Sequence, residues 1–172
     1  FDNSPKVGSI LLSDGTVVSS EGFKAGDLSA VGVIFYVRRD TILLVGTKEL
    51  GSYAYADSLV TISGVTNDYT SLGGTENTAA IMASGIASPA VNAVNKYTTY
   101  FSSCALPSAG ELRALSASLP IVNRTMKLIG GDDFQSGQYV SSSGDGTSSE
   151  SEQMYYYSCL LYTSDASDEE DR

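Results

Sequence analysis

The chain has no histidine and no tryptophan among its 172 residues, and it has only two cysteines and four prolines. Histidine is the commonest general base and the commonest metal ligand, so its absence weakens the case for both acid–base catalysis and a metal centre. A serine nucleophile would lack its usual partner for the same reason. We therefore expect a protein that is not an enzyme and that needs no cofactor.

Basic residues and long hydrophobic runs are also scarce. Ten Lys and Arg face 20 Asp and Glu, which gives a formal net charge of −10. Because a nucleic acid presents a negative phosphate backbone, we expect no nucleic-acid partner. The longest apolar runs, at 31–37 and 42–46, are too short to cross a bilayer, so no direct membrane insertion is expected. What is present, 42% apolar residues, is enough for one globular domain.

The first part of the sequence predicts β-strands. Two short apolar runs flank Ser13-Asp14-Gly15, and Asp-Gly is a strong hairpin signal. Two longer runs, AVGVIFYV (30–37) and TILLVG (41–46), flank a short charged turn. Runs without polar alternation indicate strands that are buried on both faces or central in a sheet. The stretch 47–74 has no clear period, so we predict a long loop or irregular elements there, where binding residues often lie.

The middle of the chain predicts helices at 73–87, 88–101, 109–117 and 121–131. Ser88 and Pro89 form a good N-cap and first-turn pair, and Val91, Val94 and Tyr97 share one apolar face. The last of these helices has an apolar face that begins with Ile121 and ends before two C-cap glycines. These stripes are typical of core-facing helices rather than of a ligand site.

The segment LPSAGEL (106–112) predicts how one of these helices begins. Ser108 is a natural N-cap, and Glu111 stands three residues later, as a capping box requires. Leu106 precedes the cap and is expected to pack against Leu112 and Leu115 as a hydrophobic staple. Glu111 is thereby explained as a structural residue rather than a catalytic one.

The last fourteen residues, CLLYTSDASDEEDR (159–172), resemble a translated sequencing adapter. Codons for Cys159–Ser164 can spell the transposon mosaic end used in library preparation, although Ser167 departs from the adapter pattern. We expect a non-native tail, and the alternative is an ordinary acidic, disordered terminus. Residues 1–158 then carry 15 acids and 9 bases, a net charge of −6, with Cys104 as a lone cysteine that supports no intrachain disulfide.

Several short motifs resemble one known family. They are SDGTVVSS (13–20), GGTENTAAI (73–81), LPSAGEL (106–112), IGG (129–131) and QYVSSS (138–143). Their order is similar to that of bacterial and phage C-type-lectin-like domains related to the C-terminal domain of Legionella collagen-like adhesins. The family's tryptophans are missing, with Val140 at one expected position.

This resemblance implies an α+β fold with an antiparallel sheet and two to four helices, truncated at its C-terminus. We expect a single domain over residues 1–158, with N-terminal strands in 6–46, helices in 75–129 and C-terminal strands in 138–158. The terminal strand of the family's fold would lie beyond Tyr157, where the adapter-like segment begins. The implied location is extracellular, on a bacterial cell surface or a phage virion.

The function expected from these features is non-catalytic recognition of a glycan or a protein. Tyrosines beside serines and glycines are typical of adaptable recognition surfaces. The candidate binding residues are Tyr139, Ser143, Gln153, Tyr155 and Tyr157. The alternative for this segment is an ordinary strand with aromatic filler. A structural spacer within a larger fibre or lipoprotein is the second hypothesis for the chain.

A carboxylate-based hydrolase is the third and weakest hypothesis. Its candidate acids are Glu111, Asp132, Asp133, Asp145, Glu150 and Glu152. A glycosidase needs two carboxylates across a cleft, which sequence spacing does not show. The segment GDGTSSESE (144–152) lacks the closely spaced oxygen ligands of a calcium loop, so no metal site is expected.

Overall fold

The fold was analysed in a computed structural model, which describes residues 4–24, 29–38, 41–53, 62–65, 70–96, 104–134, 139, 141–143, 154–157 and 160–163. The described residues form an α+β fold with antiparallel sheets and four helices, as predicted. The strands are β1 (Ile10–Leu12), β2 (Val17–Val18), β3 (Ala30–Arg38), β4 (Thr41–Gly46), β5 (Glu49–Tyr53), β6 (Met154–Tyr157) and β7 (Leu160–Thr163). The helices are α1 (Gly74–Ser84), α2 (Pro89–Lys96), α3 (Ala109–Ala117) and α4 (Leu119–Ile129).

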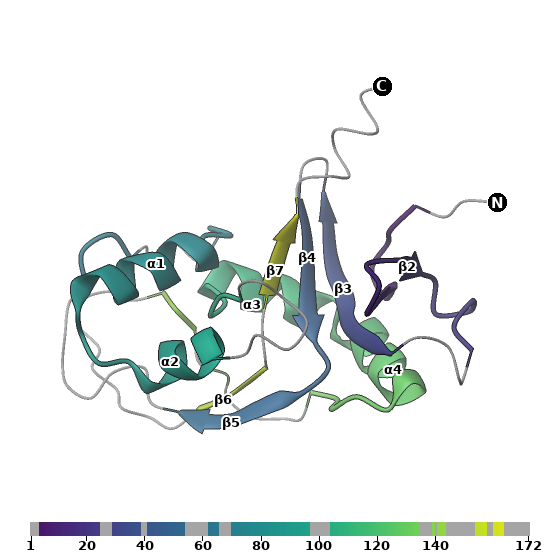
Figure 1. The fold of residues 1–172 in the computed structure, drawn as a ribbon. Helices are drawn as coiled ribbons and strands as arrows, with labels where there is room; N and C mark the ends of the chain where they lie inside the picture. Colours follow the sequence, from purple (N-terminus) through teal and green to yellow (C-terminus); the bar gives the residue numbers. More distant parts are fainter. Residues whose placement is uncertain are drawn as a thin grey trace.

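The main sheet has the strand order β2-β1-β3-β4-β7, and every pairing in it is antiparallel. β1 and β2 form the predicted Asp-Gly hairpin, in which the Thr16 amide donates to Asp14 Oδ1 (2.9 Å) and Gly15 has a φ of 89°. β3 is the middle strand of the sheet and β4 lies next to it. β4 and the first part of β3 are largely buried, as their unbroken apolar runs predicted, whereas Val37 and Arg38 at the end of β3 are exposed. Figure 1 shows these two strands rising through the middle of the molecule.

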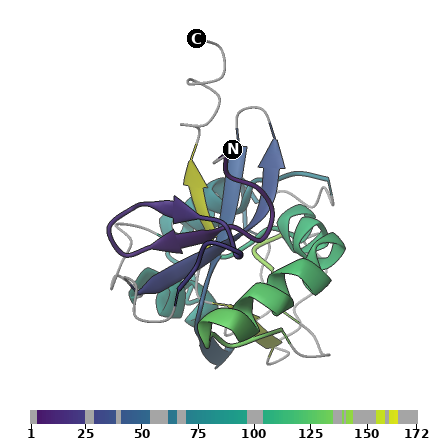
Figure 2. The same ribbon diagram turned by 90° about the vertical axis from the view of Figure 1, so that its right-hand side faces the viewer.

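The principal core lies between the main sheet and the helices α3 and α4 (Figure 2). The sheet contributes Val33, Phe35, Leu43 and Val45, and the helical side contributes Leu115, Val122, Met126 and Phe134. Ile34, Ile42 and Leu44 point to the opposite face and pack with Leu11 and Val17. Alternate residues of the same strands therefore enter two separate clusters, which is why these strands are apolar without interruption.

A second core lies between α1, α2 and β5 (Figure 1). Its buried members are Ile62, Ile81, Ala90, Val91, Val94 and Leu106. Ser88 caps α2 as predicted, because its hydroxyl accepts a hydrogen bond from the Val91 amide (3.3 Å). The predicted partner Tyr97 lies outside the described residues.

Two predicted elements, the stretch 47–74 and the helix at 121–131, differ in the structure. Part of the stretch 47–74 is the strand β5, which pairs with β6 in a separate two-stranded sheet. Such pairing between distant segments leaves no local signal in a Gly-containing sequence. α4 begins at Leu119 rather than 121, because Pro120 occupies its first turn. Ile121 is 43% exposed rather than part of a buried face, whereas Val122 and Met126 are fully buried.

The strand β7 lies within the segment that resembles an adapter. Leu160–Thr163 pair with β4, in a register that places Leu161 opposite Leu44. The edge position beside β4 is therefore filled within this chain. The non-native origin of 159–172 and the domain boundary at 158 stay predictions.

Candidate functional site

The sequence motifs around 73, 106 and 141 meet at one place, where α1 and α3 begin. We call this place the α1–α3 junction and define it by Ser71, Gly74, Ser108, Glu111 and Ser143. Its parts come from segments up to 72 residues apart in the sequence, from Ser71 to Ser143. The junction therefore depends on the tertiary fold, although each helix start carries a local signal.

The predicted capping box is confirmed at the start of α3. Ser108 Oγ accepts a hydrogen bond from the Glu111 amide (3.2 Å), and the Ser108 amide donates to Glu111 Oε1 (2.8 Å). The Ser108 hydroxyl also donates to the Ser71 carbonyl oxygen (2.8 Å). Ser108 thus fixes its own helix and the segment that leads into α1.

The predicted leucine staple is not how Leu106 packs. Leu106 is fully buried in the second core cluster, whereas Leu112 and Leu115 belong with the first. The Leu106 amide donates a hydrogen bond to Thr78 Oγ1 in α1 (3.0 Å). Leu106 therefore connects α3 to α1 rather than closing the first turn of α3.

Two glycines allow the helix starts to approach each other. A Cβ atom at Gly74 would collide with Glu111 Oε1 and lie 2.8 Å from the Leu106 carbonyl oxygen. A Cβ atom at Gly110 would collide with the Ser71 carbonyl oxygen and lie 2.9 Å from its carbonyl carbon. Because backbone atoms cannot move aside as a side chain can, only glycine fits at position 110 without displacing the chain.

The segment 141–143 packs on the same helix start. The Ser142 amide donates to the Pro107 carbonyl oxygen (2.6 Å), and Ser143 Oγ accepts the Ala109 amide (2.9 Å). Ser143, a predicted binding residue, thereby satisfies a donor in the first turn of α3. The two motifs LPSAGEL and QYVSSS are thus parts of one hydrogen-bonded assembly.

Glu111 places a buried carboxyl group at the junction. The side chain is fully buried, and its Oε2 atom has no hydrogen-bond partner within the described part of the chain. Burial raises the pKa of the Glu111 carboxyl from 4.5 to about 7, and hydrogen bonds from Ser108 and the Gly74 amide oppose this rise. The neighbouring carboxylate of Glu76 raises the pKa further. Glu111 is therefore substantially protonated below neutral pH.

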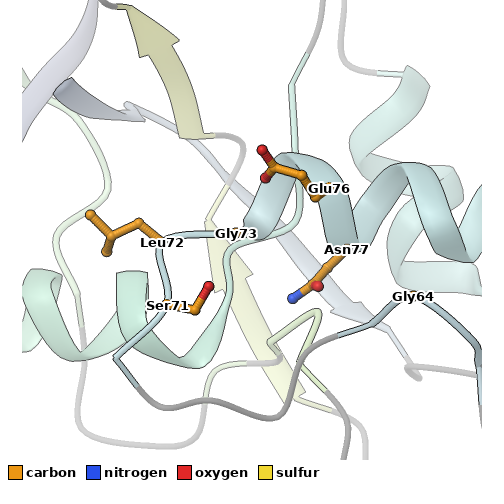
Figure 3. A pocket seen from close by; sticks show the side chains of 6 residues that line it. All are labelled: Gly64, Ser71, Leu72, Gly73, Glu76 and Asn77. Carbon is orange, nitrogen blue, oxygen red and sulfur yellow. The ribbon is translucent and has the colours of Figure 1, made fainter. Parts of the chain in front are cut away.

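A polar cavity of about 350 Å³ lies beside the junction, at the start of α1. Figure 3 shows the residues that line it: Gly64, Ser71, Leu72, Gly73, Glu76 and Asn77. The Glu76 carboxylate and the Asn77 amide point to different sides of the helix start (Figure 3). Hydroxyl, amide, carboxylate and backbone groups here could hydrogen-bond a polar ligand. The cavity adjoins the end of the 47–74 stretch. The sequence signal for a site there was that this stretch shows no helical or strand periodicity, as is typical of a loop.

The predicted binding residues do not line this cavity. Tyr139 packs on both core clusters, and its ring lies 5.3 Å from the Phe134 ring in an edge-on arrangement. Tyr155 and Tyr157 lie in β6, in register with Ser52 and Glu49 of β5. Gln153 lies outside the described residues. The structure thus assigns Tyr139 and Ser143 structural contacts, and the recognition role of the five residues stays a prediction.

Of the other candidate carboxylates, the structure describes Asp132 and Asp133. Asp132 Oδ2 accepts the Glu49 amide (2.9 Å), and burial together with Asp132 raises the pKa of Glu49. Asp145, Glu150 and Glu152 lie outside the described residues. Within the described ranges, no group of three or more Cys, Asp or Glu side chains could hold a metal ion. None of the helices described is both long enough and apolar enough to cross a membrane.

Comparison with known proteins gives a fold but no family. No family model matches the chain, and neither does any curated protein. Among solved structures, a fimbrial protein from Bacteroides ovatus matches with a TM-score of 0.61 and 15% identity. The match covers 92% of this chain and 48% of the fimbrial protein, so the chain spans about half the length of that protein. The fold is therefore like that of part of a fimbrial protein.

Proposed function

We propose that the chain is a non-catalytic adhesion domain of a bacterial surface protein or a phage tail-tip protein, which recognises a glycan or a protein outside the cell. The observation that carries this proposal is the likeness to the fimbrial protein, because fimbriae are appendages of the bacterial surface. The C-type-lectin relationship belongs to the same proposal and rests on the short motifs alone. The lack of histidine agrees with a role that needs no general base.

Two surfaces of the chain are candidates for recognition. The polar cavity at the start of α1 offers the exposed Glu76 carboxylate to a ligand with several hydroxyl or amide groups, and the buried Asn77 and half-buried Ser71 form part of its wall. The tyrosine-rich segment around Tyr155 and Tyr157 is the sequence-based candidate. Because the two surfaces share no residues, mutations in each of them can show which one binds the ligand.

The test is binding of the full chain to glycan arrays and to host-cell surfaces. Glu76→Gln and Asn77→Ala should abolish binding if the cavity is used, whereas Tyr155→Ala and Tyr157→Ala should abolish it if the tyrosines are used. Asp14→Asn removes an equal charge at the β1–β2 turn and serves as the control. Absence of binding to every glycan and cell surface would contradict the adhesion proposal.

A structural spacer within a larger appendage is the second candidate. The specific observation in its favour is that the chain matches only 48% of the fimbrial protein, as one domain of a larger subunit would. A spacer should bind nothing on the arrays and yet be required for the length of the parent fibre. Hydrolysis of a panel of sugars or peptides that is lost on mutating Glu150 or Glu152 would instead support the hydrolase.

A further inference from the structure

Glu111 does more than the capping box requires. In a capping box the glutamate side chain accepts one hydrogen bond from the N-cap amide. Here the Glu111 carboxyl also contacts the first turn of α1, where the Gly74 amide hydrogen-bonds to it and no side chain would fit at Gly74. One carboxyl group thus joins the N-termini of two helices that are 35 residues apart in sequence, counted from Gly74 to Ala109.

Opposing effects act on the charge of this carboxyl group. Two helix N-termini favour the anion through their amide dipoles. Full burial and the unpartnered Oε2 atom favour the neutral form, because a buried carboxylate needs several donors to replace water. The combined result is a pKa of about 7, well above the ordinary value of 4.5.

Few ionisable groups lie on the described segments that pack around Glu111. Glu76 of α1 is the ionisable group whose charge acts on Glu111, and it disfavours the anion. In α3 itself, Arg113 is exposed. The packed segments 71–73 and 141–143 carry no ionisable side chain, and the segment 104–107 carries only the Cys104 thiol. The described surroundings therefore offer no cation against the Glu111 carboxylate.

We propose that Glu111 is a proton-linked clasp between α1 and α3, tight when its carboxyl is protonated and loosened when the carboxyl ionises. Ionisation places a buried anion beside Glu76 with no donor to its Oε2 atom, so exposure of the carboxylate to water becomes favourable although the Ser108 and Gly74 amides still bind it. Because Ser108 also holds the Ser71 carbonyl oxygen, loosening this helix start releases the wall of the adjacent cavity. The proposal is independent of the adhesion function and would hold for a spacer domain as well.

The sign of the pH dependence follows from the raised pKa. The folded state binds the Glu111 proton more tightly than the unfolded state, so folding is favoured most below pH 4.5 and progressively less up to about pH 7. The difference between 4.5 and about 7 is about 2.5 pH units, so this group alone should increase the unfolding equilibrium constant by roughly two orders of magnitude between pH 4 and pH 8. Above about pH 8 its contribution should be constant.

The direct test is a ¹³C NMR titration of the Glu111 side-chain carboxyl in the full chain. We expect a midpoint near pH 7, with the amide signals of Ser71, Gly73 and Asn77 shifting at the same midpoint. A midpoint at or below pH 4.5 would overturn the proposal. A raised midpoint with no response in those cavity-wall amides would overturn the clasp as well, since the titration would then stay local.

Variants at Glu76 and Glu111 separate the effect of the neighbouring charge on the Glu111 pKa from the effect of Glu111 ionisation on stability. Glu76→Gln should lower the Glu111 midpoint because it removes the neighbouring negative charge, whereas Asp14→Asn should leave it unchanged. Glu111→Gln keeps an acceptor for the Ser108 amide and stays neutral at every pH. Its unfolding equilibrium constant, measured with urea from pH 4 to pH 8, should lack this increase of roughly two orders of magnitude. If Glu111→Gln does not fold, the wild-type titration still decides the matter.

Discussion

At the scale of single residues, the α1–α3 junction depends on positions that have no room to change. Three side chains there are fully buried: Leu106, Ser108 and Glu111. At Gly74 and Gly110 an added methyl group would collide with neighbouring atoms. The capping pair was predictable from sequence because its partners are three residues apart. The reasons for the two glycines were not, since their neighbours Glu111 and Ser71 are distant in the chain.

Gly110→Ala tests this point, because helix propensity and packing predict opposite results. Alanine is favoured over glycine within a helix by about 1 kcal/mol. At Gly110, however, the new methyl group would displace the Ser71 backbone, and overpacking of this kind costs about 1–3 kcal/mol. We expect a net decrease in the free energy of unfolding by urea denaturation. A free energy of unfolding equal to or above that of the unchanged chain would contradict this prediction.

At the scale of elements, the helix starts are specified more strongly than the helix faces. The caps at Ser88 and Ser108 follow local rules and are confirmed. The outward face of α4 was harder to predict, because Ile121 and Leu128 remain 43% and 52% exposed. Apolar residues are common on protein surfaces, so periodicity alone does not show which of them are buried.

Ser108→Ala and Ser88→Ala form a matched pair of cap deletions. Loss of an N-cap hydroxyl typically costs about 1 kcal/mol of stability. Ser88→Ala should cost about that much. Ser108→Ala should cost more, about 2 kcal/mol, because its hydroxyl also donates to the buried Ser71 carbonyl oxygen. Equal losses of unfolding free energy in the two variants would show that the Ser71 contact contributes nothing.

At the scale of the whole molecule, the main sheet brings together the two ends of the described chain. β4 is buried along its length and has β3 on one side and β7 on the other. The likeness to a fimbrial protein is a property of this arrangement and not of the sequence, which is only 15% identical. Short motifs indicated an α+β surface domain, but they did not indicate this structural neighbour.

Cutting the chain after residue 158 tests how much the fold depends on β7. Removal of Leu160–Thr163 would leave the β4 edge without a partner, and an apolar edge strand tends to pair with another chain. We expect the 1–158 chain to be less stable and to associate in size-exclusion chromatography. A chain cut after residue 163 is the control and should behave as the full chain does. A stable monomer of 1–158 would contradict the prediction.

The sequence by itself determined the hairpin at Asp14-Gly15, the strands β3 and β4, and the helix caps at Ser88 and Ser108. Each of these follows from residues within a few positions of one another, whose backbone and burial preferences act locally. Only the tertiary structure decided the pairing of β5 with β6, the position of the cavity and the burial of Glu111. These depend on contacts between distant segments, where the low polarity of the surroundings, rather than the residue type, sets the charge of a carboxyl group.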